Sequence, residues 1–236
     1  MAHDGVEFSA AFERNGEGFT FANILTSFVD HVLVVDDGSA DETAVRALMA
    51  GDDRLMLIRH LANRGVGAAI VTGYQHALRL SVDFVVVLAG DGQMDPGEIE
   101  RLLEPLVLGH ADYVKGNRLG HPELHLRMPV TRRWANRLLT QCTRWVVGDD
   151  NLNDSQCGYT AITRHALQRL PLSELWPRYG YPNDLLGLLR EAGLRVVDRP
   201  VTPIYGEEVS GIRPLRVIPT LGYVLARAWL RRHVVS

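Results

Sequence analysis

A short acidic turn follows the most apolar run of the chain. Residues 85–89 are three valines, a leucine and an alanine, and they lead directly into Gly90, Asp91, Gly92 and Gln93. An apolar run without polar alternation predicts a strand covered on both faces. Asp91 then lies at the carboxyl end of that strand, where open α/β sheets bind ligands. A carboxylate there suits Mg²⁺ or Mn²⁺ bound to a substrate phosphate; the alternative is that Asp91 only closes a turn.

Two further acids follow a second apolar run. Residues 31–35 end at Asp36 and Asp37, so these carboxylates are predicted at the same edge of the sheet. A fourth acid, Asp95, stands directly before Pro96. This pair is typical of a helix N-terminus, and we expect Asp95 to cap a helix rather than to bind a ligand.

A glycine-rich turn opens a predicted helix over residues 66–80. Asn63 and Arg64 precede it, and Gly65 and Gly67 flank its first residue. Backbone N–H groups at such a turn can bind phosphate. The glycines can equally serve close packing of the helix on the sheet, so both interpretations stay open.

The order of elements predicts a mostly parallel sheet with helices on both faces. The predicted strands are residues 31–35, 55–59, 85–89, 111–115, 158–163, 194–197 and 201–205, with a short strand around Val6, Phe8 and Ala10. The predicted helices are residues 19–28, 41–50, 66–80, 96–108, 130–147, 185–192 and 213–232, the last with an interruption at Pro219 as an alternative. We divide the chain into a main domain, residues 1–210, and a basic amphipathic helix, residues 211–236.

Composition narrows the class of protein. The 236 residues carry a formal net charge of −3, which gives no indication of nucleic-acid binding. Arginines are dense in residues 115–147 and after residue 208, and Arg118 and Arg132 are candidates for binding an anion. The two cysteines predict reduced thiols in the cytoplasm. No apolar run reaches the length of a membrane-spanning helix.

Five short motifs, in this order and spacing, resemble glycosyltransferase family 2, and most closely its polyprenyl-phosphate mannose and glucose synthases. They are residues 36–39 (DDGS), 63–67 (NRGVG), 90–93 (GDGQ), 116–118 (GNR) and 157–161 (CGYTA). The resemblance implies a GT-A type, Rossmann-like sheet. It also implies transfer of a hexose from a nucleotide-sugar donor to a lipid phosphate.

The resemblance assigns roles to individual positions. Asp36 and Asp37 match acids that hold the base and ribose, and Arg64 and Gly67 match nearby nucleotide contacts. The remaining matches are Asp91 and Gln93 for the metal, Arg118 for the acceptor phosphate, Asp154 and Asp184 for acids facing sugar and acceptor, and Ser210 and Arg213 for a closing loop. The metal would neutralise the departing diphosphate.

Several alternatives remain open. If the acceptor is a saccharide hydroxyl, a carboxylate must take its proton, with Asp184 the first candidate and Asp154 the second. Ala89 occupies the first position of the family's D-x-D motif, so a non-catalytic nucleotide-sugar binding or docking protein is the second hypothesis. A nucleotidyltransferase, which would release pyrophosphate, is the third.

The final helix has two interpretations of its own. Its apolar stripe and arginines suit a peripheral position on an anionic membrane, at the inner face of the cell membrane. Equally, it can pack on the domain with its arginines outward. The sequence does not predict the oligomeric state.

Overall fold

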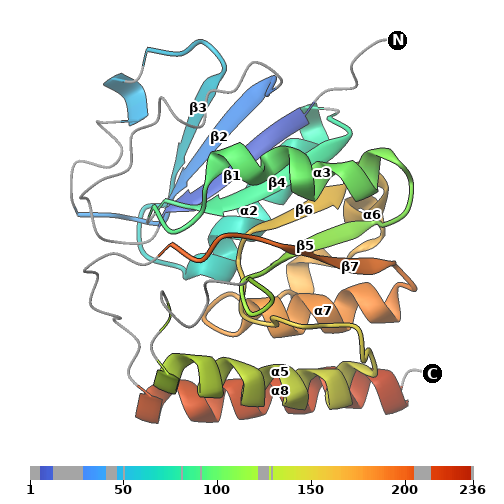
Figure 1. Cartoon of the computed structure of the whole chain (residues 1–236). Helices are drawn as coiled ribbons and strands as arrows, with labels where there is room; N and C mark the ends of the chain where they lie inside the picture. The colour runs from blue at the N-terminus through green and yellow to red at the C-terminus, as the bar shows by residue number, and fades with distance from the viewer. Residues whose placement is uncertain are drawn as a thin grey trace.

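The central feature of the fold is a seven-stranded sheet with the order β3-β2-β1-β4-β6-β5-β7 (Figure 1). The computed structural model describes residues 6–12, 29–40, 47–49, 51–80, 82–90, 92–121, 128, 130–204 and 214–234. The strands are β1 (Val6–Phe12), β2 (His31–Asp36), β3 (Leu55–Arg59), β4 (Phe84–Ala89), β5 (Tyr113–Asn117), β6 (Thr160–Thr163) and β7 (Val196–Pro200). The prediction of a mostly parallel sheet is confirmed.

Strand direction places the chemistry-bearing turns at one edge. Strands β1, β2, β3 and β4 pair in parallel, and β5 pairs in parallel with β7. Strand β6 lies antiparallel between β4 and β5, so β5 runs in the same direction as β4. The carboxyl ends of β2, β4 and β5 therefore meet at the same edge of the sheet.

The apolar strands separate two hydrophobic cores, which explains their sequence. In β4, Val85 and Val87 belong to one core, while Val86 and Leu88 belong to the other. Successive side chains of a strand point to opposite faces. A strand buried on both faces must therefore be apolar at every position, as β4 is.

Helices cover both faces of the sheet (Figure 1). One core contains residues of α2 (Val66–Leu80), α6 (Arg164–Arg169) and α7 (Tyr181–Glu191). The other contains residues of α3 (Ile99–Val107), which continues from the short helix η2 (Pro96–Glu98). A further short helix, η3 (Leu172–Glu174), precedes α7.

Two long helices form an additional layer. Helices α5 (Val130–Val147) and α8 (Pro214–Val234) lie side by side next to α7 (Figure 1). Val224 and Ala228 of α8 are buried, whereas Trp134, Leu138 and Trp145 of α5 are largely exposed. This layer thus buries one face and leaves large apolar side chains on its surface.

Several predicted boundaries need correction. Residues 201–204 form no strand, and β7 covers the region between the two short strands that were predicted. Helix α8 continues through Pro219. The predicted helix over residues 19–28 lies outside the described residues, and only residues 47–49 of the helix predicted over 41–50 are described, as helical.

Candidate functional site

An acid pair at the end of β2 is enclosed by its own neighbours. Asp36 is fully buried; its Oδ1 accepts from the Ser39 N–H at 2.7 Å, and its Oδ2 lies 3.1 Å from Arg59 Nε. Asp37 accepts from the backbone N–H groups of Arg64 at 2.9 Å and Gly65 at 2.7 Å. These bonds fix the loop after β3 against the end of β2 and so shape this side of the site.

A histidine that the sequence left unassigned completes this arrangement. The Nδ1 of His60 lies 2.7 Å from Oδ1 of Asp37, and its Nε2 lies 2.9 Å from Oγ1 of Thr72. His60 is almost fully buried. It therefore links the acid pair to helix α2.

The end of β5 carries an arginine held by a buried carboxylate. Arg118 contacts Asp154 through Nε at 2.9 Å and Nη2 at 3.1 Å, and its backbone N–H donates to the same carboxylate at 3.1 Å. Asp154 is fully buried, while the Arg118 side chain keeps 14% of its surface exposed. A two-point contact of this kind fixes the plane of the guanidinium. Two of the predicted site residues are thus brought together.

Opposing effects set the pKa of Asp154. Burial alone would raise this pKa, but the charges of Arg118 and Lys115 outweigh burial and lower it to about 2. The carboxylate is therefore ionised at neutral pH. A carboxylate with so low a pKa is a weak base, and Arg118 contacts both of its oxygens, so the contacts of Asp154 are those of a holder of Arg118.

Lys115 is a component of the site that sequence reasoning missed. No individual role was assigned to it from the sequence, yet its side chain is fully buried. Its Nζ donates to the backbone carbonyls of Asp154 and, at 3.1 Å, of Cys157. A charged residue inside a predicted buried strand requires such partners, and its position next to Val114 could have identified it.

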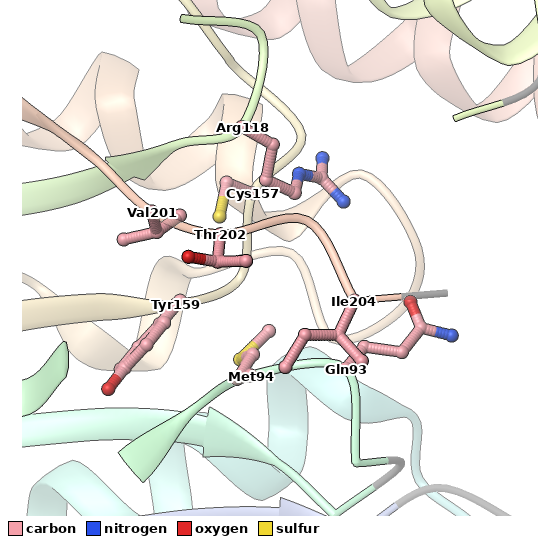
Figure 2. A pocket seen from close by; sticks show the side chains of 8 residues that line it. All are labelled: Gln93, Met94, Arg118, Cys157, Tyr159, Val201, Thr202 and Ile204. Carbon is pink, nitrogen blue, oxygen red and sulfur yellow. The ribbon is translucent and has the colours of Figure 1, made fainter. Parts of the chain in front are cut away.

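A small cavity lies at the carboxyl edge between β4 and β5. Its lining residues are Gln93, Met94, Arg118, Cys157, Tyr159, Val201, Thr202 and Ile204 (Figure 2). Arg118 and Gln93, both predicted as site residues, thus line the same cavity. Burial raises the pKa of the Cys157 thiol, which keeps it neutral.

Hydrogen bonds fix the walls of this cavity. Tyr159 donates its hydroxyl to the Asp95 carbonyl at 2.8 Å. Glu98 accepts from the N–H of Thr202 at 2.9 Å and from its hydroxyl at 3.0 Å. The turn after β4 is therefore joined to the segment after β7.

The prediction that Asp95 caps a helix is confirmed, because its Oδ1 accepts from the Gly97 N–H at 2.8 Å.

The glycine-rich turn before α2 packs directly against residues 176–178. A Cβ at Gly67 would lie 2.1 Å from the Trp176 carbonyl oxygen, and Gly65 has a φ of +102°. The N–H of Ala68 donates to the Pro177 carbonyl at 3.0 Å. Of the two interpretations of these glycines, close packing is the one that this geometry supports. The Arg64 side chain is exposed beside them.

Asp184 lies away from this cavity, under the final helix. It is fully buried and accepts from Arg231 Nη1 at 2.8 Å, Arg227 Nη1 at 3.5 Å and the Trp176 N–H at 2.8 Å. Two arginines of α8 thus point inward, contrary to the expectation that a packed helix would turn its arginines outward. These contacts are those of an anchor for α8, and the role of Asp184 as the first candidate base stays a prediction.

Some predicted site residues lie outside the part of the chain that the structure describes. These are Asp91, Ser210, Arg213 and the side chain of Arg132. Among the described residues, no group of three His, Cys, Asp or Glu side chains could hold a metal ion. Gln93, which the structure does describe, supplies a hard amide oxygen at the cavity.

Comparison with solved structures defines the fold class as GT-A. The crystal structure of glucosyl-3-phosphoglycerate synthase from Mycobacterium tuberculosis in complex with uridine diphosphate superposes with a TM-score of 0.67. It covers 97% of this chain and 80% of its own, at 22% sequence identity. The same enzyme has been crystallised with Mn²⁺ and uridine diphosphate.

Sequence comparison defines the family. The model of Glycosyl transferase family 2 matches residues 20–170, more than half of the chain. The chain belongs to this family and is a glycosyltransferase, which confirms the resemblance.

Two curated proteins illustrate its relatives. A UDP-N-acetylglucosamine–dolichyl-phosphate N-acetylglucosaminyltransferase of Methanococcus voltae is 29% identical over 199 residues, 78% of this chain and 79% of that protein. A polyprenol monophosphomannose synthase of Mycolicibacterium smegmatis is 31% identical over 176 residues, 73% of this chain and 66% of that protein.

None of the helices in the described part of the chain has the length and apolar character needed to cross a bilayer.

Proposed function

We propose that this glycosyltransferase moves a hexose from a nucleotide-sugar donor to a polyprenyl phosphate. Relatives with about 30% identity act on dolichyl or polyprenyl phosphate by name. The observation that carries the proposal is Arg118, fixed at the carboxyl-edge cavity by the buried carboxylate of Asp154. A guanidinium that is positioned and partly exposed is suited to the oxygens of a phosphate acceptor.

The acceptor chemistry requires no protein base. The second pKa of a phosphate monoester is about 6, so its oxygen is largely ionised at neutral pH. That oxygen forms a bond to the anomeric carbon of the sugar, while the bond from this carbon to the nucleoside diphosphate breaks. Both acids proposed as alternative bases are fully buried and hydrogen-bonded to arginines, which supports phosphate over a saccharide hydroxyl.

The donor is proposed to bind along the same edge, on the β2 side. Asp36 and Asp37 shape that side of the site, and the exposed Arg64 lies beside it. A divalent cation, Mg²⁺ or Mn²⁺, would be held by Asp91 and Gln93, and it would neutralise charge on the departing diphosphate. Roles for Arg132, Ser210 and Arg213 at the acceptor and the closing loop remain predictions.

Peripheral contact with a membrane follows from the nature of the acceptor. Helix α5 exposes Trp134 and Leu138 to 68% each and Trp145 to 71%, and α8 exposes Ile218 to 65%. Large exposed apolar side chains beside arginines suit a helix layer that lies on a bilayer surface. We propose that α5 and α8 bring the site to the inner face of the cell membrane, where the acceptor lipid resides.

Release of nucleoside diphosphate tests the proposal. A panel of sugar nucleotides is incubated with Mn²⁺, with and without detergent-solubilised polyprenyl phosphate, and release is measured. We expect release that requires both the metal and the lipid phosphate, and its loss in Arg118→Gln. Donor binding without release would instead support a non-catalytic binding protein, and release of pyrophosphate would support a nucleotidyltransferase.

A further inference from the structure

A second, larger cavity lies between α5 and the turn that follows β5. Its volume is about 350 Å³. The polar residues that line it are Asn117, Arg137, Thr140, Gln141, Arg144 and Asn153. It shares no lining residue with the cavity of Arg118. It is therefore a separate place for a ligand.

The charges that face this cavity are positive. Among the described residues, no acidic side chain pairs with Arg137 or Arg144. Arg144 donates a hydrogen bond from Nε to the Leu152 carbonyl and another from Nη2 to Oδ1 of Asn153, the latter at 2.9 Å. These two bonds orient its guanidinium. Asp198 is bound by another lining residue, Asn153, whose backbone N–H donates to its Oδ2 at 2.5 Å. An anion is the ligand that two guanidiniums without a carboxylate partner favour.

The cavity borders the exposed apolar surface of α5. Trp134 and Leu138 lie three residues before Arg137 and Gln141, and Trp145 lies four residues after Gln141. Residues at these spacings are neighbours on a helix surface. An anionic group in the cavity would thus have apolar side chains directly beside it.

We propose that this cavity binds the phosphodiester of an anionic bilayer phospholipid, at a site separate from that of the acceptor phosphate. A free phosphate would use the arginines alone, whereas a phospholipid also places acyl chains against the exposed tryptophans. Two guanidiniums offer planar, paired donors that match phosphate oxygens. The inference rests on the membrane contact of the proposed function and adds to it a specific headgroup site.

Vesicle binding with a charge-conserving variant tests this proposal. Sedimentation is measured with phosphatidylcholine vesicles and with vesicles that also contain phosphatidylglycerol, without acceptor lipid. Arg137→Lys keeps the charge but removes the paired donors of the guanidinium. Arg133→Lys is the matched control, because Arg133 belongs to the same helix but does not line the cavity.

We expect Arg137→Lys to lower partition into anionic vesicles about tenfold, the effect of losing about one hydrogen bond to a charged group. Arg133→Lys should match the parent protein, and partition into phosphatidylcholine alone should be equal for all three. Equal binding of the two variants to anionic vesicles would overturn the headgroup site and leave the proposed function intact. Absence of binding to every vesicle would overturn the membrane contact and, with it, the headgroup site. Sugar transfer to detergent-solubilised polyprenyl phosphate is measured separately, so it tests the proposed reaction independently of vesicle binding.

Discussion

Replacing Asp154 with asparagine perturbs the buried charge cluster at a single point. Asparagine has nearly the same shape, but it leaves the Arg118 guanidinium and the buried Lys115 ammonium without their counter-charge. Removing one partner of a buried pair costs about 3–5 kcal/mol. We expect the free energy of unfolding of Asp154→Asn at pH 7 to fall by this amount.

The pH dependence of the same variant gives a second, independent magnitude. The pKa of Asp154 is about 2 in the folded protein, against an ordinary value of 3.8. This difference corresponds to about 2 kcal/mol of stability from ionisation. Because the folded pKa is the lower one, that stability is present above pH 3.8 and is lost as the pH falls toward 2. The gap between the parent protein and the variant should narrow over this range.

Urea unfolding followed by tryptophan fluorescence at several pH values between 7 and 2 measures both effects. Asp198→Asn is the control, because burial raises the pKa of Asp198. Its ionised form is therefore disfavoured in the folded state, and its replacement should be neutral or stabilising at pH 7. The reasoning is refuted if Asp154→Asn unfolds at the parent urea concentration at pH 7 and shows the parent pH dependence.

The other predictions concern packing, the final helix and the metal. Gly67→Ala should lower stability by about 1–3 kcal/mol, since its Cβ would meet the Trp176 carbonyl; an unchanged melting temperature contradicts this. Asp184→Asn should destabilise the protein by about 3–5 kcal/mol because it weakens the contact with Arg231. The folded fraction should keep its activity. Complete loss of turnover in folded protein would support a catalytic role for Asp184. Chelation of divalent cations should abolish nucleoside diphosphate release. Gln93→Ala should raise the Mn²⁺ concentration required for half-maximal release. Full activity in the presence of a chelator would contradict a role for a divalent cation in the reaction.

The buried strands of the sheet could be predicted because their apolar residues are consecutive in the sequence. Residues 32–35 and 85–89 are apolar at every position, and each strand is covered on both faces. The carboxyl-edge position of Asp36 and Asn117 follows from strand direction alone. The antiparallel direction of β6 could not be read from its four residues, since their composition suits either direction.

The partners of charged side chains were much less predictable. The partners of Lys115 and Asp184 lie 39 and 47 residues away along the chain. The pairing of Arg118 with Asp154 spans 36 residues and depends on the position of β6 between β4 and β5. Such contacts arise only when the topology is complete, so residue type and spacing indicated the site but not its internal bonds.

Analysis of the lipid product tests the central claim most directly. The protein is incubated with the accepted sugar nucleotide, Mn²⁺ and a polyprenyl phosphate, and the lipid fraction is examined by mass spectrometry. We predict a lipid whose mass has increased by one hexosyl unit, with the sugar attached through the phosphate, in an amount equal to the nucleoside diphosphate released. Nucleoside diphosphate release with an unmodified lipid, or a sugar found on a saccharide hydroxyl, would contradict the account.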